Sequence, residues 1–206
     1  MIAIIDYGVG NLFSLQCSLH AIGQQTVVTA NAQEILSADR ILLPGVGAFG
    51  DAVEKLNRSG LNEVIHQAAQ MGKPLMGICL GMQLLFDESC EFGLHKGLGL
   101  IPGRIRPIQE VIPKNLKVPH MGWNALIFKR PDPLLSGIHD SDCVYFVHSF
   151  YAADCAENTV ATTEYGAELT AIVRNKNVCG CQFHPEKSGN VGLNILRAFC
   201  EEESTC

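Results

Sequence analysis

One cysteine of this sequence, Cys79, lies in a setting typical of a nucleophile. It is the centre of the segment GICLG, residues 77–81, which follows an apolar run and precedes a stretch with helical periodicity. In a nucleophile elbow, a strand, a sharp turn and a helix hold the reactive side chain above a sheet, and small residues two positions before and after it let strand and helix approach closely. A helix N-terminus also favours a thiolate. The segment alone is equally compatible with a buried structural cysteine, so the partners of Cys79 must decide.

A thiolate nucleophile needs a base, and the base needs an acid that orients it. His184 and Glu186, in the segment FHPEKS, have the required types and spacing. Pro185 favours an extended backbone at His184, and side chains two positions apart in an extended chain point to the same side. We therefore expect Glu186 to contact the imidazole of His184. The rival bases His120 and His148 have no carboxylate two positions later, and we interpret both as structural or peripheral.

A glycine-rich segment, GVGAFG at residues 45–50, matches the G-x-G-x-x-G pattern of dinucleotide-binding sites. It follows the third expected strand rather than the first, and the acid near the expected distance, Glu63, falls inside a helical pattern instead of at a strand end. We therefore do not expect dinucleotide binding. The alternative is that backbone N–H groups of this loop stabilise an oxyanion, together with the N–H of Leu80.

These residues need a sheet to bring them together, and the first half of the chain has the pattern of one. Short apolar runs alternate with stretches of helical periodicity, which predicts parallel strand pairing and an α/β fold with helices on both faces of the sheet. The expected strands are residues 1–7, 26–30, 40–45 and 73–79, and the expected helices are residues 11–23, 48–71 and 80–89.

The second half, from about residue 97 to residue 183, consists mainly of short strand patterns. They are residues 104–108, 118–124, 143–152, 159–165, 169–175 and 178–183, and a helical pattern follows at residues 189–202. Residues 175–177 predict a hairpin turn. We expect a mostly parallel central sheet flanked by helices, with an added antiparallel strand layer, in a single domain spanning residues 1–206.

The composition excludes several classes of protein. The 206 residues are 47% hydrophobic and 17% charged, which suits a sizeable core and argues against disorder. A net charge of -6 without a basic cluster argues against nucleic-acid binding. No apolar run reaches the roughly 18 residues that a membrane helix needs, and no basic leader precedes Asp6. We therefore expect a cytoplasmic protein that does not enter membranes.

The nine cysteines are an odd number in a chain large enough to fold without disulfides, so we interpret them as reduced thiols. Cys179 and Cys181 lie two positions apart, but no second close pair accompanies them at the spacing of a zinc site. We expect neither a metal nor a cofactor.

Three segments in this order and spacing, PGVGAFG, GICLGMQLLF and FHPEKS, resemble the class I glutamine amidotransferases. These are glutaminases with a Cys-His-Glu triad on a flavodoxin-like α/β sheet. Three further segments resemble the glutaminase subunits of imidazole glycerol phosphate synthases: DYGVGN at residues 6–11, PHMGWN at 119–124 and VHSFY at 147–151. The resemblance spans nearly the whole chain, and only the last few residues, ending in Cys206, depart from it.

The resemblance implies a reaction and a role for each matching residue. Cys79 attacks the side-chain amide of L-glutamine, and His184, oriented by Glu186, protonates the departing ammonia before water cleaves the γ-glutamyl thioester. The oxyanion and substrate contacts implied by the match are Val46, Gly47, Leu80, Gln83, Ser149 and Phe150. Gln83 has independent support, because it lies four residues after Cys79 and shares its face on a helix.

The resemblance also implies a partner. In this family the ammonia passes to a cyclase subunit, a (β/α)8 barrel in a heterodimer, which makes imidazole glycerol phosphate and an aminoimidazole carboxamide ribotide. Asn11, Trp123 and Lys187 match positions near that interface. An exposed tryptophan is a plausible interface anchor on general grounds, and the alternative is that Trp123 is a core ring.

Two other functions stay open at this point. The chain could be a glutaminase of another biosynthetic pathway, such as that of pyridoxal phosphate, or a non-catalytic or redox-sensing thiol protein on the same fold. The flexible glycines of the loop at residues 45–47 further predict weak glutaminase activity in the isolated chain, because partner binding would select one orientation of its peptides.

Overall fold

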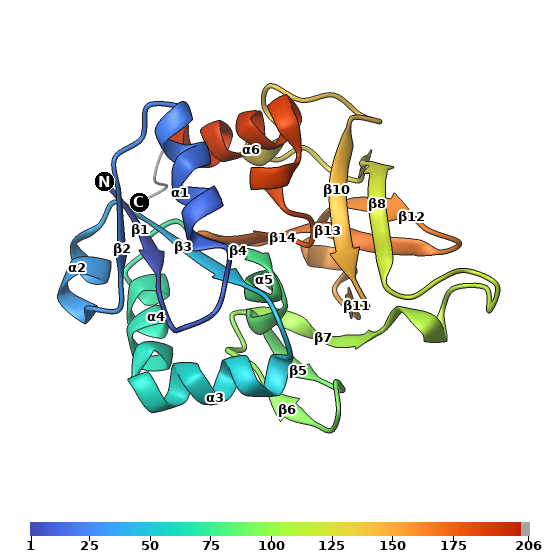
Figure 1. Ribbon diagram of the computed structural model, residues 1–206, viewed down its shortest axis with the longest axis horizontal. Helices are drawn as coiled ribbons and strands as arrows, with labels where there is room; N and C mark the ends of the chain where they lie inside the picture. The colour runs from blue at the N-terminus through green and yellow to red at the C-terminus, as the bar shows by residue number, and fades with distance from the viewer. Residues whose placement is uncertain (203–206) are drawn as a thin grey trace.

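The computed structural model describes residues 1–202, so Cys206 and the three residues before it lie outside the described part of the chain. An eight-stranded sheet forms its centre, in the order β2-β1-β3-β4-β14-β13-β12-β9 (Figure 1). The strands are β1 (Ile2–Ile5), β2 (Thr26–Thr29), β3 (Arg40–Gly45), β4 (Leu75–Cys79), β9 (Ile127–Phe128), β12 (Thr159–Glu164), β13 (Glu168–Asn175) and β14 (Val178–Cys181). The first five in spatial order are parallel and the remaining three antiparallel, so the predicted mixed α/β sheet is confirmed.

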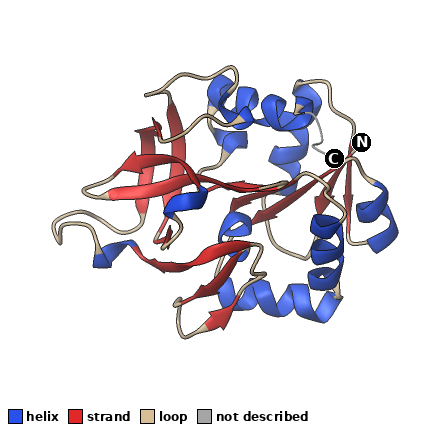
Figure 2. Cartoon of the chain, turned by 180° about the vertical axis from the view of Figure 1, so that it is seen from behind, coloured by secondary structure: helices blue, strands red, loops and turns tan. Residues whose placement is uncertain are grey.

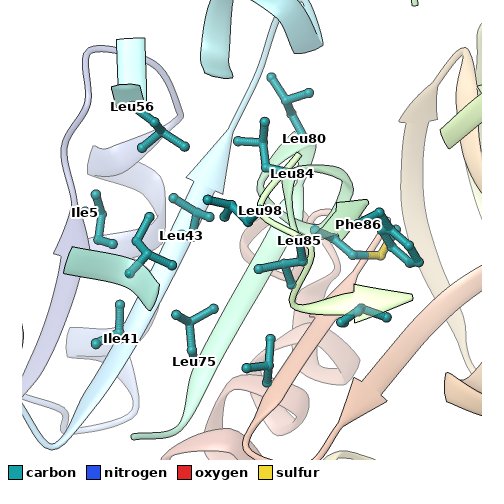
Figure 3. Packing of buried hydrophobic residues seen from close by; sticks show 14 of the residues in the cluster. Ile5, Ile41, Leu43, Leu56, Leu75, Leu80, Leu84, Leu85, Phe86 and Leu98 are labelled. Carbon is teal, nitrogen blue, oxygen red and sulfur yellow. The ribbon is translucent and has the colours of Figure 1, made fainter. Parts of the chain in front are cut away.

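Helices cover both faces of the parallel strands. They are α1 (Leu12–Ala21), α2 (Ala32–Ser37), α3 (Phe49–Ser59), α4 (Leu61–Gln70), α5 (Leu80–Leu84) and α6 (Gly189–Glu201). In Figure 1, α1 and α6 lie above the sheet, whereas α3 and α4 lie below it. Side chains of β1 alternate accordingly: Ile2 and Ile4 pack in the cluster that holds α1 and α6, and Ala3 and Ile5 pack with α3 and α4. Figure 3 shows the cluster on the side of α3 and α4, in which Ile5, Leu43 and Leu56 lie close together.

Two smaller sheets extend the molecule on the side away from the chain termini (Figure 2). One pairs β8 (His120–Ala125) with β10 (Cys143–His148), and the other contains β5 (Phe86–Ser89), β6 (His95–Lys96), β7 (Ile101–Pro107) and β11 (Phe150–Ala153). Short 3-10 turns are η1 (Ile108–Glu110), η2 (Pro133–Leu135), η3 (Ala156–Asn158) and η4 (Pro185–Lys187). The predicted antiparallel layer is therefore divided, since part of it continues the main sheet and part forms these two sheets.

Three expected elements differ from the structure for identifiable reasons, and one helix was missed. The helix expected over residues 48–71 is two helices, because Gly60 between them adopts a left-handed φ of 71°. The helix expected over residues 80–89 ends at Leu84, and Phe86 begins strand β5, where pairing with β7 overrides helical periodicity. The strand expected over residues 143–152 breaks at Ser149, where the chain passes from one small sheet to the other. Helix α2, with Asn31 as its N-cap, was not predicted.

The register of the central strands determines what meets at their carboxyl ends. Gly45 of β3 is opposite Cys79 of β4, and Cys181 of β14 is opposite Ile78. Three segments therefore emerge side by side at this edge: the glycine loop after β3, the turn at Cys79, and the residues that follow β14. Ligand sites of open parallel sheets lie at this edge. Within residues 1–202, none of the helices has the length and apolar character required to span a bilayer.

Candidate active site

Cys79 lies at a strained turn between β4 and α5. Its φ of 55° and ψ of -113° are rare for a residue with a side chain, and such strain concentrates at functional sites. The two flanking glycines are sterically required. A Cβ added at Gly81 would lie 1.7 Å from the carbonyl oxygen of Leu43, and one at Gly77 would lie 2.6 Å from the carbonyl oxygen of Gly81. The arrangement is that of a nucleophile elbow.

A cavity of about 320 Å³ opens above the sulfur of Cys79. This volume suits a small-molecule ligand. The sequence-predicted residues that line it are Val46, Gly47, Cys79, Leu80, Gln83, Ser149, Phe150 and His184. Segments separated by about a hundred positions thus meet in one cavity, although Cys79 itself is only 8% exposed.

His184 and Glu186 form a buried pair beside the cavity. The Nδ1 atom of His184 lies 2.8 Å from Oε1 of Glu186, and both side chains are almost fully buried. The sequence predicted this contact, but it predicted an extended backbone as its cause. Glu186 instead lies on the 3-10 turn η4. Burial disfavours the charged imidazole, yet its interactions with Cys79 and Glu186 outweigh this effect and raise the pKa of His184 to about 9. The imidazole is therefore a proton carrier that holds its proton near neutral pH.

The glycine loop lies beside Cys79, as the register of β3 and β4 requires. Gly47 has a φ of 98°, a conformation that side chains rarely adopt, and Val46 is exposed at the cavity. Tyr7 holds the start of this loop, because its hydroxyl donates to the carbonyl of Pro44 at 2.9 Å. Burial, and then the proximity of Cys79, raise the pKa of Tyr7, so its hydroxyl keeps its proton. The sequence analysis gave no role to Tyr7.

Glu91 is a cavity residue that the sequence analysis missed. Its carboxylate is nearly buried and accepts a hydrogen bond from the N–H of Phe49, at the start of α3, at 2.6 Å. An acid at a helix N-terminus is favoured by the helix dipole. The sequence offered little signal for Glu91, because the helix wrongly expected over residues 80–89 left the path of the following loop undefined.

Gln83 and Phe150 meet in the cavity wall. The Nε2 of Gln83 donates to the carbonyl of Phe150 at 3.3 Å and to Oε1 of Gln182 at 3.0 Å. Both amide hydrogens of Gln83 are thus used inside the protein, and its oxygen is the group left for a ligand. The contact with Gln182, which is fully buried, was not anticipated.

The two rival bases, His120 and His148, contact each other, and only His148 is among the residues that line the cavity. His148 lines the cavity, its Nδ1 lies 2.7 Å from the carbonyl of Phe150, and its Nε2 lies 2.9 Å from Nδ1 of His120. Burial lowers the pKa of His148 to about 4 and also lowers the pKa of His120. His120 stacks on Tyr165 with ring centres 4.1 Å apart. Neither histidine contacts a carboxylate within residues 1–202, and their structural role stays a prediction.

Two of the expected interface residues lie around Tyr145. Trp123 on β8 is 55% exposed, so the alternative of a core ring was wrong, and its ring centre lies 6.0 Å from that of Tyr145. The Nζ atom of Lys187 lies over the same Tyr145 ring at 6.0 Å. Asn11, at the start of α1, lines a small crevice together with His184 and Glu186. Asn11 thus lies beside the catalytic candidates, and Trp123 and Lys187 both lie against Tyr145, whose carbonyl accepts from the backbone N–H of His184 at 3.0 Å.

Within residues 1–202, the cysteines form no disulfide, and no cluster of three or more His, Cys, Asp or Glu side chains is arranged to hold a metal ion. The buried pair Cys179 and Cys181 lies on β14, where burial raises the pKa of both thiols. These two residues therefore behave as core side chains rather than as ligands.

Comparison with known proteins gives one consistent family. The profile of the family described as "Glutamine amidotransferase class-I" matches residues 3–202. A protein of Oceanobacillus iheyensis is 48% identical over 202 residues, 98% of both chains, and one of Geobacter metallireducens is 49% identical over 96% of both chains. A Listeria monocytogenes protein is 46% identical over 100% of this chain and 98% of its own. All three are named imidazole glycerol phosphate synthase subunit HisH.

Solved structures agree in fold at much lower identity. A crystal structure of a glutamine amidotransferase superimposes with a TM-score of 0.75 at 17% identity and covers 98% of each chain. The structure of PurLQS from Thermotoga maritima gives a TM-score of 0.73 at 21% identity over 97% of this chain and 96% of that one.

Proposed function

The chain belongs to the class I glutamine amidotransferase family, and from this premise we propose that it hydrolyses L-glutamine at Cys79 and supplies ammonia within an imidazole glycerol phosphate synthase. The observation that carries the catalytic part is the meeting of Cys79 with the buried His184–Glu186 pair in one cavity. The pathway follows from relatives that are 46–49% identical over nearly their full length and share one name.

The reaction has two halves. The Cys79 thiolate attacks the amide carbon of glutamine and a C–S bond forms. The developing oxyanion accepts hydrogen bonds from the backbone N–H of Leu80 and from the N–H groups of the loop at Val46 and Gly47. His184 gives its proton to the leaving nitrogen, the C–N bond breaks, and ammonia departs from a γ-glutamyl thioester. Water then loses a proton to His184 and attacks the thioester, and glutamate leaves while the thiolate is restored.

Charged and polar groups of the cavity suit the remainder of glutamine. We assign the α-ammonium group of the substrate to the Glu91 carboxylate, since Glu91 is a nearly buried acid in the cavity wall and also caps α3. The free oxygen of Gln83 accepts a second substrate N–H, and the backbone of Ser149 and Phe150 completes that side of the cavity.

A partner follows from the relatives, because each is named as a subunit of a synthase. We propose that the partner is a cyclase subunit in a heterodimer, that it has the (β/α)8 barrel fold, and that it covers the surface around Asn11, Trp123 and Lys187. The exposed Trp123 and Met121 on β8 offer apolar area for such a contact. Ammonia released beside the crevice at Asn11 would then pass to the partner without entering solvent. The cytoplasmic location predicted from the sequence is part of this proposal.

The decisive experiment measures glutamate release by the purified chain, with and without the cyclase subunit of a histidine pathway. We expect weak activity alone and strong stimulation by the partner, because the glycine loop has more than one orientation available. Cys79→Ser should abolish glutamine-dependent synthesis by the complex and preserve synthesis from added ammonia. High activity alone would contradict the loop argument, and stimulation only by the partner of another pathway would reassign the chain.

A further inference from the structure

A chain of side-chain hydrogen bonds connects the cavity wall to the sulfur of Cys79. It begins at the carbonyl oxygen of Phe150, which accepts from Nε2 of Gln83 at 3.3 Å. The same nitrogen donates to Oε1 of Gln182 at 3.0 Å. The Nε2 of Gln182 in turn lies 3.8 Å from Sγ of Cys79, within hydrogen-bonding range of the larger sulfur atom. Gln182 has no part in the mechanism described above.

The direction of this chain is determined at its far end. A backbone carbonyl can only accept, so Gln83 must turn its NH2 group toward Phe150. Because that NH2 group also faces Gln182, the amide of Gln182 must present its oxygen there. The NH2 group of Gln182 then necessarily faces the sulfur of Cys79. Rotating either amide by half a turn would oppose two acceptors or two donors.

The position of Gln182 is held as firmly as its orientation. Its side chain is fully buried, and its backbone N–H donates to the carbonyl of Ala171, at 2.9 Å, on the neighbouring strand β13. The Phe150 carbonyl that starts the chain is also bound by Nδ1 of His148 at 2.7 Å. A buried donor with one acceptor in reach gains most when that acceptor is anionic.

We infer that Gln182 is a positioning residue of the glutaminase reaction: its amide N–H, oriented by Gln83 and Phe150, donates to the Cys79 sulfur and stabilises the thiolate over the thiol. The inference rests on the proposed function. The proton that leaves the sulfur goes to the imidazole of His184. The same N–H favours the return of the thiolate when water cleaves the thioester.

Alkylation of Cys79 tests this inference without any glutamine. The rate at which iodoacetamide modifies Cys79 in the full chain is measured against pH, and peptide mass mapping separates Cys79 from the other cysteines. In Gln182→Glu, a carboxylate oxygen replaces the N–H beside the sulfur, and in Gln182→Leu the donor is lost. We expect the rate at pH 7 to fall roughly tenfold in both variants. The rates should rejoin that of the native chain at high pH, where the sulfur is ionised in all of them.

Two further variants distinguish this role from a merely structural one. Thr163→Val removes a buried hydroxyl that donates to the Ala125 carbonyl at 2.9 Å, away from the cavity, and should leave the pH profile of alkylation unchanged. Gln83→Leu frees the Gln182 amide to rotate. It should lower the alkylation rate at pH 7, as the Gln182 variants do, but by a smaller amount. The melting temperature of each variant reports whether it folds.

A native alkylation profile in folded Gln182→Leu would overturn the inference, as would a loss of rate that persists at high pH. Neither result would affect the proposed glutaminase activity, which depends on Cys79-dependent release of glutamate. Conversely, a chain that releases no glutamate would remove the proposed function, and the alkylation profile would still show whether Gln182 stabilises the thiolate.

Discussion

The two sides of the candidate active site are built in different ways. On the side of Cys79, β4 and α5 are adjacent in sequence, and the turn between them is determined by backbone packing at Gly77 and Gly81. On the side of His184, the chain contributes polar side chains whose positions depend on hydrogen bonds, such as the contact of His184 with Glu186. The Cys79 side therefore depends on the absence of a Cβ at the two glycines. The His184 side depends on the proton of the imidazole and on its hydrogen bond to Glu186.

This difference predicts whether a substitution mainly changes the free energy of unfolding or mainly changes the rate of the reaction. A change at Gly77 or Gly81 acts mainly on the free energy of unfolding, because a Cβ there collides with backbone atoms. A change on the His184 side acts mainly on the rate of the reaction, because the imidazole loses its orientation or its charge, and its effect on the free energy of unfolding depends on pH. The following four variants or conditions, from the largest expected effect to the smallest, test that division.

Glu186→Gln should lower the rate of glutamine hydrolysis about 1,000-fold or more, because the imidazole of His184 loses the carboxylate that orients it. The melting temperature should stay near that of the native chain. Steady-state kinetics in the presence of the cyclase subunit measure the effect. Glu168→Gln, which removes an exposed carboxylate paired with Lys129, is the matched control and should retain full activity. Activity within threefold of native in Glu186→Gln would show that His184 needs no orienting acid.

Gly81→Ala should lower the free energy of unfolding by about 3 kcal/mol. The added Cβ would lie 1.7 Å from the carbonyl oxygen of Leu43, so strand or helix must shift. Urea denaturation followed by circular dichroism measures this. Gly23→Ala is the control, because Gly23 has a left-handed φ of 81° with open space around it, and only backbone strain of about 1 kcal/mol is expected. Equal losses in both variants would contradict the role of packing at the elbow.

Stability should fall as pH rises through the range in which His184 loses its proton. The pKa of His184 is about 9, raised above the usual 6.5, so the folded chain binds the proton more tightly than the unfolded chain does. The resulting stabilisation is complete below pH 6.5 and disappears as pH passes 9. Urea denaturation at pH 6 and at pH 9.5 gives the free energy of unfolding at each pH. This free energy should decrease more between the two pH values in the native chain than in His184→Gln. An identical decrease in both would mean that the folded state does not raise this pKa.

Tyr7→Phe should have the smallest effect, a loss of about 1 kcal/mol in the free energy of unfolding. The variant removes the hydroxyl that donates to the Pro44 carbonyl and leaves the ring in place. Because this bond supports the base of the glycine loop, glutamine turnover with the cyclase subunit should fall less than tenfold. A loss of activity as large as that of Glu186→Gln would place Tyr7 in the chemistry itself and weaken the distinction between the two sides.

Much of this could be predicted from the sequence. The glycines around Cys79, the parallel first half of the chain and the segment FHPEKS each have local patterns, and the α/β fold and the resemblance to glutamine amidotransferases are confirmed. Prediction failed where pairing partners decide, as at Phe86, which has helical periodicity but forms a strand with β7. It also failed for Glu91 and Gln182, whose neighbours in space are far away in sequence.

The sequence by itself determined the pattern of strand, flanking glycines and helix around Cys79, and the short spacing that lets Glu186 reach His184. Only the tertiary structure decided that Cys79 meets the His184–Glu186 pair, and that Gln182 points its amide at the sulfur of Cys79. The physical reason is that steric limits act between neighbours along the chain, whereas strand register and buried hydrogen bonds join residues a hundred positions apart and leave no periodic trace.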